Sequence, residues 1–300
     1  MNPAEPLRVG VLSLARPTFD VPFAEQVCAD AWKLMEQIPV DWVGSEVLLF
    51  DAESVESQLT KLKKKPIDLL LIMQLTFTDA TMTVKIAKSF DVPLLFWSFP
   101  EKRTGGRLRL NSLCGVNLAA HALGKSGIQC DYINLSPNDP ETSEDLSSWI
   151  RAFQTRKNLS STKLAVIGKH PDGFHTCAFD SRKLKEISGV TVEQMELTDL
   201  FDEAEKIEQK TVSLIRSELD SKINGLELVE QEPLEKSIRI LSTLRKKLKV
   251  KVIRDFRFVA GQNFLLSTAA QLVEQWVFLI RKELRQDAKR MYMVLLVLLY

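Results

Sequence analysis

A basic segment that contains two adjacent glycines has the residue types expected of an anion-binding loop. It spans residues 99–117, with the sequence FPEKRTGGRLRLNSLCGVN, and follows an apolar run at 92–97 that is typical of a buried parallel strand. Its basic side chains lie around Gly105 and Gly106: they are Lys102, Arg103, Arg107 and Arg109. Glycine lets the backbone turn sharply and approach a ligand closely. The segment is therefore predicted to bind an anion, the alternative being a solvated surface loop.

The place of this segment in the chain supports the same prediction. In an open α/β sheet, ligands bind in the loops that leave the carboxyl ends of the strands. Asn111 or Ser112 can cap a helix that begins here, and the N-terminus of a helix attracts anions. We therefore expect Asn111 to lie in the same binding site as the arginines.

Composition excludes several classes of partner. The chain has 40 basic and 39 acidic residues, so no overall charge draws it to nucleic acid or to a membrane. Its four cysteines are scattered without a CxxC pair, which suits a reducing compartment and argues against a disulfide framework or a structural zinc site. The first residues, MNPAEPLRVGVLSLARP, show no secretory signal pattern. A cytoplasmic protein is expected.

The hydrophobic pattern of the first half alternates between strands and helices. Strands are predicted at 7–14, 46–50, 67–73, 92–97 and 129–134, and helices between them at 21–37, 55–62, 78–89 and 112–126. This order is typical of a parallel sheet with helices on both faces, in a Rossmann-like or flavodoxin-like arrangement. No GxGxxG follows the first strand, which argues against a dinucleotide ligand.

The same pattern begins again after a helix predicted at 144–159. Strands at 163–168 and 190–195 and helices within 198–223 indicate a second α/β domain. We therefore predict an N-terminal domain at 1–160 and an incomplete second domain at 161–250. The loop at 169–177 contains His170, His175 and Cys177, but it lacks the spacing of a zinc module, so no metal ligands are expected there.

Several stretches together resemble the L-fucose/L-arabinose isomerase superfamily, in particular its fucose-isomerase-like branch. They are LSLARPTFDVPFAEQVC (12–28), LIMQLTFTDATM (71–82), the segment at 99–117, and GKHPDGFHTCAFD (168–180). The resemblance covers roughly residues 7–250 and implies a protein of carbohydrate metabolism that interconverts aldoses and ketoses. In the family a divalent metal, usually manganese, polarises the sugar oxygens, and a carboxylate moves a proton through an enediol. The resemblance also implies a cytoplasmic homo-oligomer whose active sites are shared between subunits.

The resemblance assigns substrate contacts to the N-terminal domain. Arg16 would bind sugar oxygens or an anionic substituent, unless it only pairs with Asp20 or Glu25. Trp97 would stack on the sugar ring, unless it belongs to the core. Three further arginines in the segment at 99–117 are more than a neutral sugar needs, so a sulfonated or phosphorylated sugar, and hence a sulfosugar isomerase, is a possible variant.

After about residue 250 the resemblance stops. The family should next show strings like RCWPEFF and CEADVYG, whose acidic residues bind the metal. Read in another frame, the degenerate codons for residues 258–276 permit RCWPEFFTQYGCAACGAM, and those for 287–298 permit CEADVYGVVSA. We interpret 251–300 as an out-of-frame tail produced by a frameshift. Without those ligands this truncated chain is expected to bind no manganese, to contain no catalytic residue and to be inactive, with a non-catalytic sugar- or anion-binding module as the alternative.

Overall fold

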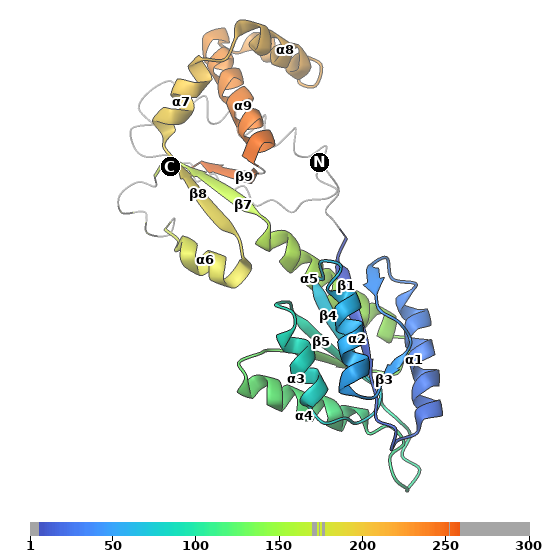
Figure 1. The fold of residues 1–300 in the computed structure, drawn as a ribbon. Coiled ribbons are helices and arrows are strands. Elements are labelled where there is room, and N and C mark those ends of the chain that lie inside the picture. The colour runs from blue at the N-terminus through green and yellow to red at the C-terminus, as the bar shows by residue number, and fades with distance from the viewer. Residues whose placement is uncertain (1–5, 170–172, 174, 176–177, 252, 259–300) are drawn as a thin grey trace. The chain divides into compact units, whose positions relative to one another are not determined.

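Six consecutive residues of strand β4 (Leu69–Gln74) are buried, which requires a layer on each face of the sheet. The structure is a computed structural model that describes residues 6–169, 173, 175, 178–251 and 253–258. It divides into two units, Met1–Asn158 and Leu159–Tyr300, which are described separately (Figure 1).

Unit 1 is built on one parallel sheet. Its strands are β1 (Arg8–Leu14), β2 (Asp41–Val43), β3 (Leu48–Leu49), β4, β5 (Leu94–Ser98) and β6 (Asp131–Asn134). Their order is β2-β1-β4-β5-β6, with β3 also paired to β1, and every pair is parallel. When β2 and β3 are taken together as the second strand, this is the 2-1-3-4-5 order of flavodoxin-like folds. The prediction of a parallel α/β sheet is confirmed.

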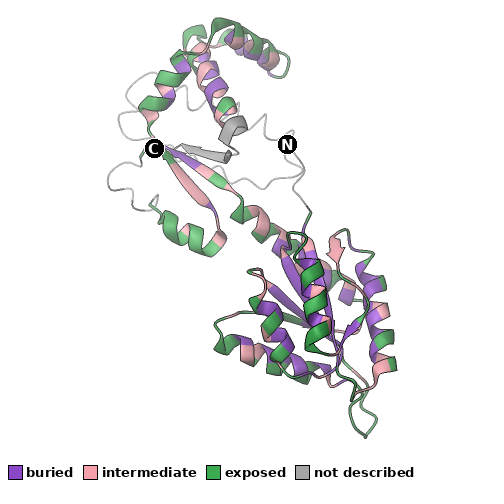
Figure 2. Ribbon diagram, viewed as in Figure 1, coloured by how far each residue is buried: buried purple, intermediate pink, exposed green. Residues whose placement is uncertain are grey.

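Helices cover both faces of this sheet. They are α1 (Val21–Met35), α2 (Ala52–Leu62), α3 (Thr81–Lys88), α4 (Ser112–Lys125) and α5 (Thr142–Ser160). One apolar cluster joins α1 and α5 to the sheet, and a second cluster joins α2, α3 and α4 to its other face. The helices turn buried side chains to the sheet and exposed ones to solvent (Figure 2). The chain order reverses between β1 and β4, and this switch point is where doubly wound folds bind ligands.

The single strand predicted at 46–50 is replaced by two short strands, β2 and β3. Gly44 lies between them, where the chain passes very close to β1. A Cβ atom at this position would come within 2.6 Å of the Val11 carbonyl oxygen, so only glycine fits. The close approach interrupts the strand, and an apolar-run criterion does not detect β2 because its residues are only half-buried.

Unit 2 contains a smaller parallel sheet. Its strands are β7 (Lys163–Ile167), β8 (Thr191–Met195) and β9 (Ile253–Phe258), in the order β8-β7-β9. Its helices are α6 (Ser181–Ser188), α7 (Leu197–Glu205), α8 (Gln209–Asp220), the 3-10 helix η2 (Leu226–Leu228) and α9 (Gln231–Lys251). Residues 253–258 thus pair with β7, although they fall in the segment expected to be an out-of-frame tail. Residues 259–300 of that segment lie outside the described residues.

In the part of the chain that the structure describes, no helix combines the length and the apolar character needed to cross a bilayer.

Two glycine substitutions test the packing of unit 1. We expect Gly44→Ala to lower the free energy of unfolding by about 1–3 kcal/mol, because the added methyl group would overlap the Val11 carbonyl. Unfolding is followed by tryptophan fluorescence, since four of the five tryptophans lie in this unit: Trp32, Trp42, Trp97 and Trp149.

The matched control is Gly124→Ala in α4, where a Cβ would meet no atom within 4 Å. It should raise the free energy of unfolding by about 0.5–1 kcal/mol, because alanine restricts the unfolded chain and favours helix. Equal effects of the two substitutions would show that the close approach at Gly44 is not a constraint.

Candidate functional site

The loops that follow β1 and β4 are fixed to each other at the switch point. The backbone N–H of Arg16 donates to Thr76 Oγ1 at 2.7 Å, and the rings of Phe19 and Phe77 lie 6.2 Å apart. The Arg16 side chain is exposed. Hydrogen bonds from Thr81 lower the pKa of the Asp79 carboxyl, and the charge of Arg16 adds to this effect.

The loop that follows β5, at residues 99–111, is bonded to both of these loops. The Asp20 N–H donates to the Arg109 carbonyl at 3.1 Å, and the Phe77 N–H donates to the Leu110 carbonyl at 2.8 Å. The structure therefore brings Arg16 and the segment predicted to bind anions to the same edge of the sheet. This shared edge, formed by residues 15–20, 75–80 and 99–111, is the candidate site.

Arg109 is bound within the protein. Its Nε donates to Asp20 Oδ2 at 2.7 Å, and its guanidinium carbon lies 3.9 Å from the centre of the Phe23 ring. The hydrogen bond from Arg109 lowers the pKa of Asp20, and the Phe23 N–H adds to the effect. Asp20, which the sequence offered as a partner for Arg16, is thus the partner of Arg109. Since a carboxylate already binds it, Arg109 serves to hold the loop after β5 against the loop after β1.

Three other arginines of the candidate site make no ion pair with any described residue. Arg107 donates to the Thr18 carbonyl at 3.2 Å and lies over the Phe19 ring at 5.0 Å. Neither Arg16 nor Arg103 makes an ion pair with any residue that the structure describes, and both are exposed. These three guanidinium groups are available to bind an anion.

Glu101 organises the loop and was missed by the sequence analysis. Its carboxylate accepts the backbone N–H groups of Arg109, Leu110 and Asn111 at 2.6, 3.0 and 2.7 Å. Successive N–H groups that converge on one point form a nest for an anion. Here the nest is filled by the protein's own carboxylate. The only sequence signal was an isolated acidic residue within a strongly basic segment.

The expected helix cap is wrong in detail. Asn111 has a left-handed backbone, with φ of 52°, and its side chain makes no capping bond to α4. Ser112 uses its hydroxyl differently: Oγ donates to the Gln74 carbonyl and accepts the Phe99 N–H at 3.0 Å. Ser112 therefore ties the start of α4 to β4 and to the end of β5.

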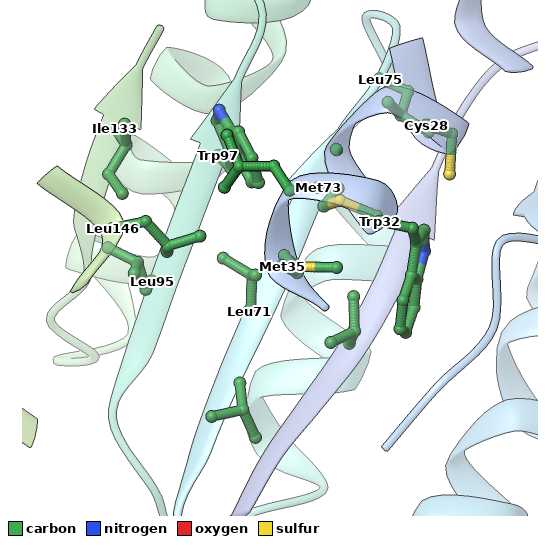
Figure 3. Close-up of a cluster of buried hydrophobic side chains, with 14 of the residues drawn as sticks. Cys28, Trp32, Met35, Leu71, Met73, Leu75, Leu95, Trp97, Ile133 and Leu146 are labelled. Carbon is green, nitrogen blue, oxygen red and sulfur yellow. The ribbon is translucent and has the colours of Figure 1, made fainter. Parts of the chain in front are cut away.

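Trp97 does not fit the expected stacking role. Its side chain has 0% exposure, its Nε1 donates to the Leu135 carbonyl at 2.9 Å, and its ring lies 5.1 Å from that of Phe99. It packs among Met73, Leu95 and Ile133 in the core (Figure 3). A ring without an exposed face offers no surface to a sugar, so the core alternative describes Trp97.

Metal donors do not gather in the described part of the chain. No three His, Cys, Asp or Glu side chains within it lie close enough together to hold a metal ion. His170 and Cys177 of the loop at 169–177 lie outside the described residues.

Replacement of Glu101 by glutamine tests the filled nest. An amide offers one acceptor oxygen and places an NH₂ group against an N–H donor, so the loop should open more often. Charged hydrogen bonds contribute about 1.5–3 kcal/mol, so amide exchange at Leu110 and Asn111 should speed up roughly 10- to 100-fold. Hydrogen exchange measures this. Glu25→Gln, at an exposed position of α1, is the control. Unchanged exchange in Glu101→Gln would contradict this role.

Comparison with known proteins identifies the family. The model of the fucose/sulfoquinovose isomerase N-terminal domain matches residues 10–160. The sulfoquinovose isomerase of Priestia aryabhattai is 30% identical over 197 residues, which are 66% of this chain and 44% of that protein. The corresponding enzymes of Alkalicoccus urumqiensis and Clostridium sp. strain MSTE9 are each 28% identical, over 204 and 222 residues, or 68% and 73% of this chain.

These alignments span 44%, 46% and 49% of the three relatives, so the chain corresponds to about half of each. The resemblance to the fucose-isomerase-like branch is confirmed. Because the domain model matches half of the chain and includes most of β1, all of β4 and β5, and the loops after them, the chain belongs to the fucose/sulfoquinovose isomerase family.

Proposed function

We propose that this chain is the substrate-binding portion of an aldose–ketose isomerase whose substrate is an anionic sugar, with a sulfonated sugar as the first candidate. One observation carries the proposal. Arg16, Arg103 and Arg107 are exposed, make no ion pair with any described residue, and belong to the loops after β1 and β5. The relatives described as sulfoquinovose isomerases support the same class of substrate.

The chemistry of these groups favours an anion over a neutral sugar. A guanidinium group presents planar N–H donors, carries a permanent charge and matches oxyanions in geometry. Sugar hydroxyls are recognised as well by neutral donors and acceptors. Arg109 and Glu101 would hold the loop rather than bind the ligand, because each already has a partner in the protein.

Isomerisation would require more than the candidate site offers. A proton must move between adjacent carbons, and the oxygens on those carbons must be polarised. The family resemblance implies that a divalent metal, usually manganese, would supply that polarisation in the intact protein. The donor set of the described residues does not fit a manganese site. We infer that this chain binds the sugar but does not convert it. In an intact member of the family, the metal ligands would come after the position that corresponds to about residue 250.

Binding of sulfoquinovose tests the proposal. Without added metal, sulfoquinovose should raise the melting temperature of unit 1 in a concentration-dependent way, because a ligand stabilises the state that binds it. Glucose, which has a hydroxyl in place of the sulfonate, should give no shift at the same concentration. The double substitution Arg103→Gln and Arg107→Gln should weaken binding at least tenfold, since each charged hydrogen bond contributes about 1.5–3 kcal/mol.

Lys64→Gln together with Lys65→Gln, at the end of α2, removes the same charge elsewhere in unit 1 and should leave the affinity unchanged. Equal binding of glucose would contradict an anionic substrate. Equal binding of inorganic sulfate would instead favour a general anion-binding module.

The inferred lack of catalysis has a separate test. The chain incubated with sulfoquinovose and Mn²⁺ should form no ketose detectable by NMR. Measurable conversion would contradict the inference that the metal ligands are missing.

The proposed frameshift is tested on the gene. Sequencing of the DNA between the codons for Leu244 and Phe258 should show one inserted or deleted base. An unshifted reading frame would contradict the out-of-frame origin that we propose for residues 251–300.

A further inference from the structure

Gln74 is a polar residue at the end of the central strand, where an apolar side chain would be expected. Its side chain is 0% exposed, and a buried amide must find hydrogen-bond partners inside the protein. Nε2 donates to the Thr76 carbonyl at 2.7 Å and to Thr78 Oγ1 at 2.9 Å. These bonds bend residues 75–78 back onto the end of β4.

The bent loop supports the other two loops of the candidate site. Thr76 Oγ1 accepts the Arg16 N–H, and the Phe77 N–H donates to the Leu110 carbonyl. A change in the path of residues 76–77 would therefore displace both the segment that carries Arg16 and the segment that carries Arg107.

Gln74 also contacts the start of α4. Its backbone carbonyl accepts the Ser112 hydroxyl. A Cβ atom on Gly115 would lie 3.0 Å from Cγ, Cδ and Nε2 of Gln74, so the absence of a side chain lets the first turn of α4 rest directly on the amide. A single side chain is thus packed between the loop after β4 and the helix that follows residues 99–111.

This arrangement is not the one that stability alone would favour. Gln74 Oε1 is buried and finds no donor among the described residues, and a buried acceptor without a donor destabilises a fold. Methionine or leucine would fill the same space without that penalty. The two hydrogen bonds that Nε2 donates fix the path of the loop, and an apolar residue could not make them.

We propose that Gln74 is a positioning residue of the anionic-sugar site: it acts through Thr76 and Thr78 to place Arg16 and the 99–111 loop, without touching the ligand. This inference rests on the proposed function. It predicts that altered chemistry at Gln74 changes ligand affinity in a folded protein.

Gln74→Glu gives a reversible test of this role. Burial should raise the pKa of the introduced carboxyl. When protonated, the acid can donate to the Thr76 carbonyl in place of Nε2. When ionised, it has no proton to donate and repels that oxygen. Sulfoquinovose affinity should therefore approach that of the wild type at pH 5 and be at least tenfold weaker at pH 8, measured by calorimetry well below the melting temperature.

Gln58→Glu is the matched control, because Gln58 is a half-buried glutamine of the same unit whose Nε2 donates to Ser45 Oγ at 3.1 Å. Its affinity should stay constant between pH 5 and 8. Gln74→Met should bind at least tenfold more weakly at every pH, because methionine has no donor. A purely structural role would change the melting temperature without this pH-dependent affinity.

Amide exchange separates failure of this inference from failure of the proposed function. In Gln74→Met, exchange at Arg16 and Phe77 should speed up at least tenfold without any ligand, because their N–H bonds depend on the loop. If the wild type binds no sulfoquinovose but exchange speeds up, the proposed function fails and the positioning of the loop stands. If exchange and affinity are both unchanged in Gln74→Met, the positioning role is overturned.

Discussion

Unit 1 depends on three buried parallel strands that end at the same level. Gln74 of β4 pairs with Leu14 of β1 on one side and with Ser98 of β5 on the other. The register is fixed because Leu71 and Met73 face one apolar cluster while Leu70 and Ile72 face the other. A shift by one residue would exchange these two sets. The loops after the three strands therefore start side by side at one edge of the sheet.

The charges of these loops must then be compatible with one another. Arginines gathered at one edge repel each other, and the structure reduces that repulsion in three ways. Asp20 neutralises Arg109, and the rings of Phe19 and Phe23 face the guanidinium groups of Arg107 and Arg109. Glu101, in the same loop as Arg107 and Arg109, adds a negative charge, and its carboxylate accepts backbone N–H groups. What remains is a limited set of free cations rather than a uniformly basic surface.

The sequence predicted the sheet better than the site because the two depend on different ranges of interaction. The apolar runs at 67–73 and 92–97 could be predicted as strands from local composition alone, because a continuous apolar run indicates burial on both faces. The highly charged helices α6 and α9 were not predicted, and β2 is too short and too exposed to form a pattern. The region at 198–223, where helices were expected, does contain α7 and α8, because the amphipathic spacing of a helix can be recognised within a short stretch of sequence.

At the site, the positions of the basic residues could be predicted but not their partners. Arg109 and Asp20 are 89 residues apart, so no local pattern distinguishes Arg109 from Arg103, which makes no ion pair within the described part of the chain. Trp97 lies in β5, whose five residues are all buried, and the apolar pattern of such a strand does not show which residue reaches a ligand. Glu101 lies 8 to 10 residues before the backbone N–H groups that it accepts, so its residue type and its neighbours in the sequence do not predict its role.

The choice of arginine and low-pKa carboxylates makes the charge of the candidate site insensitive to pH. Guanidinium groups stay charged in proteins, and hydrogen bonds hold the pKa values of Asp20 and Asp79 below their ordinary value of 3.8. A sulfonate is likewise a constant anion, whereas a phosphate monoester changes charge near pH 6. A site of constant charge suits a ligand of constant charge. In the proposed function, selectivity would come from where the loops place the arginines, and the buried amide of Gln74 would control affinity through those loops without contacting the ligand.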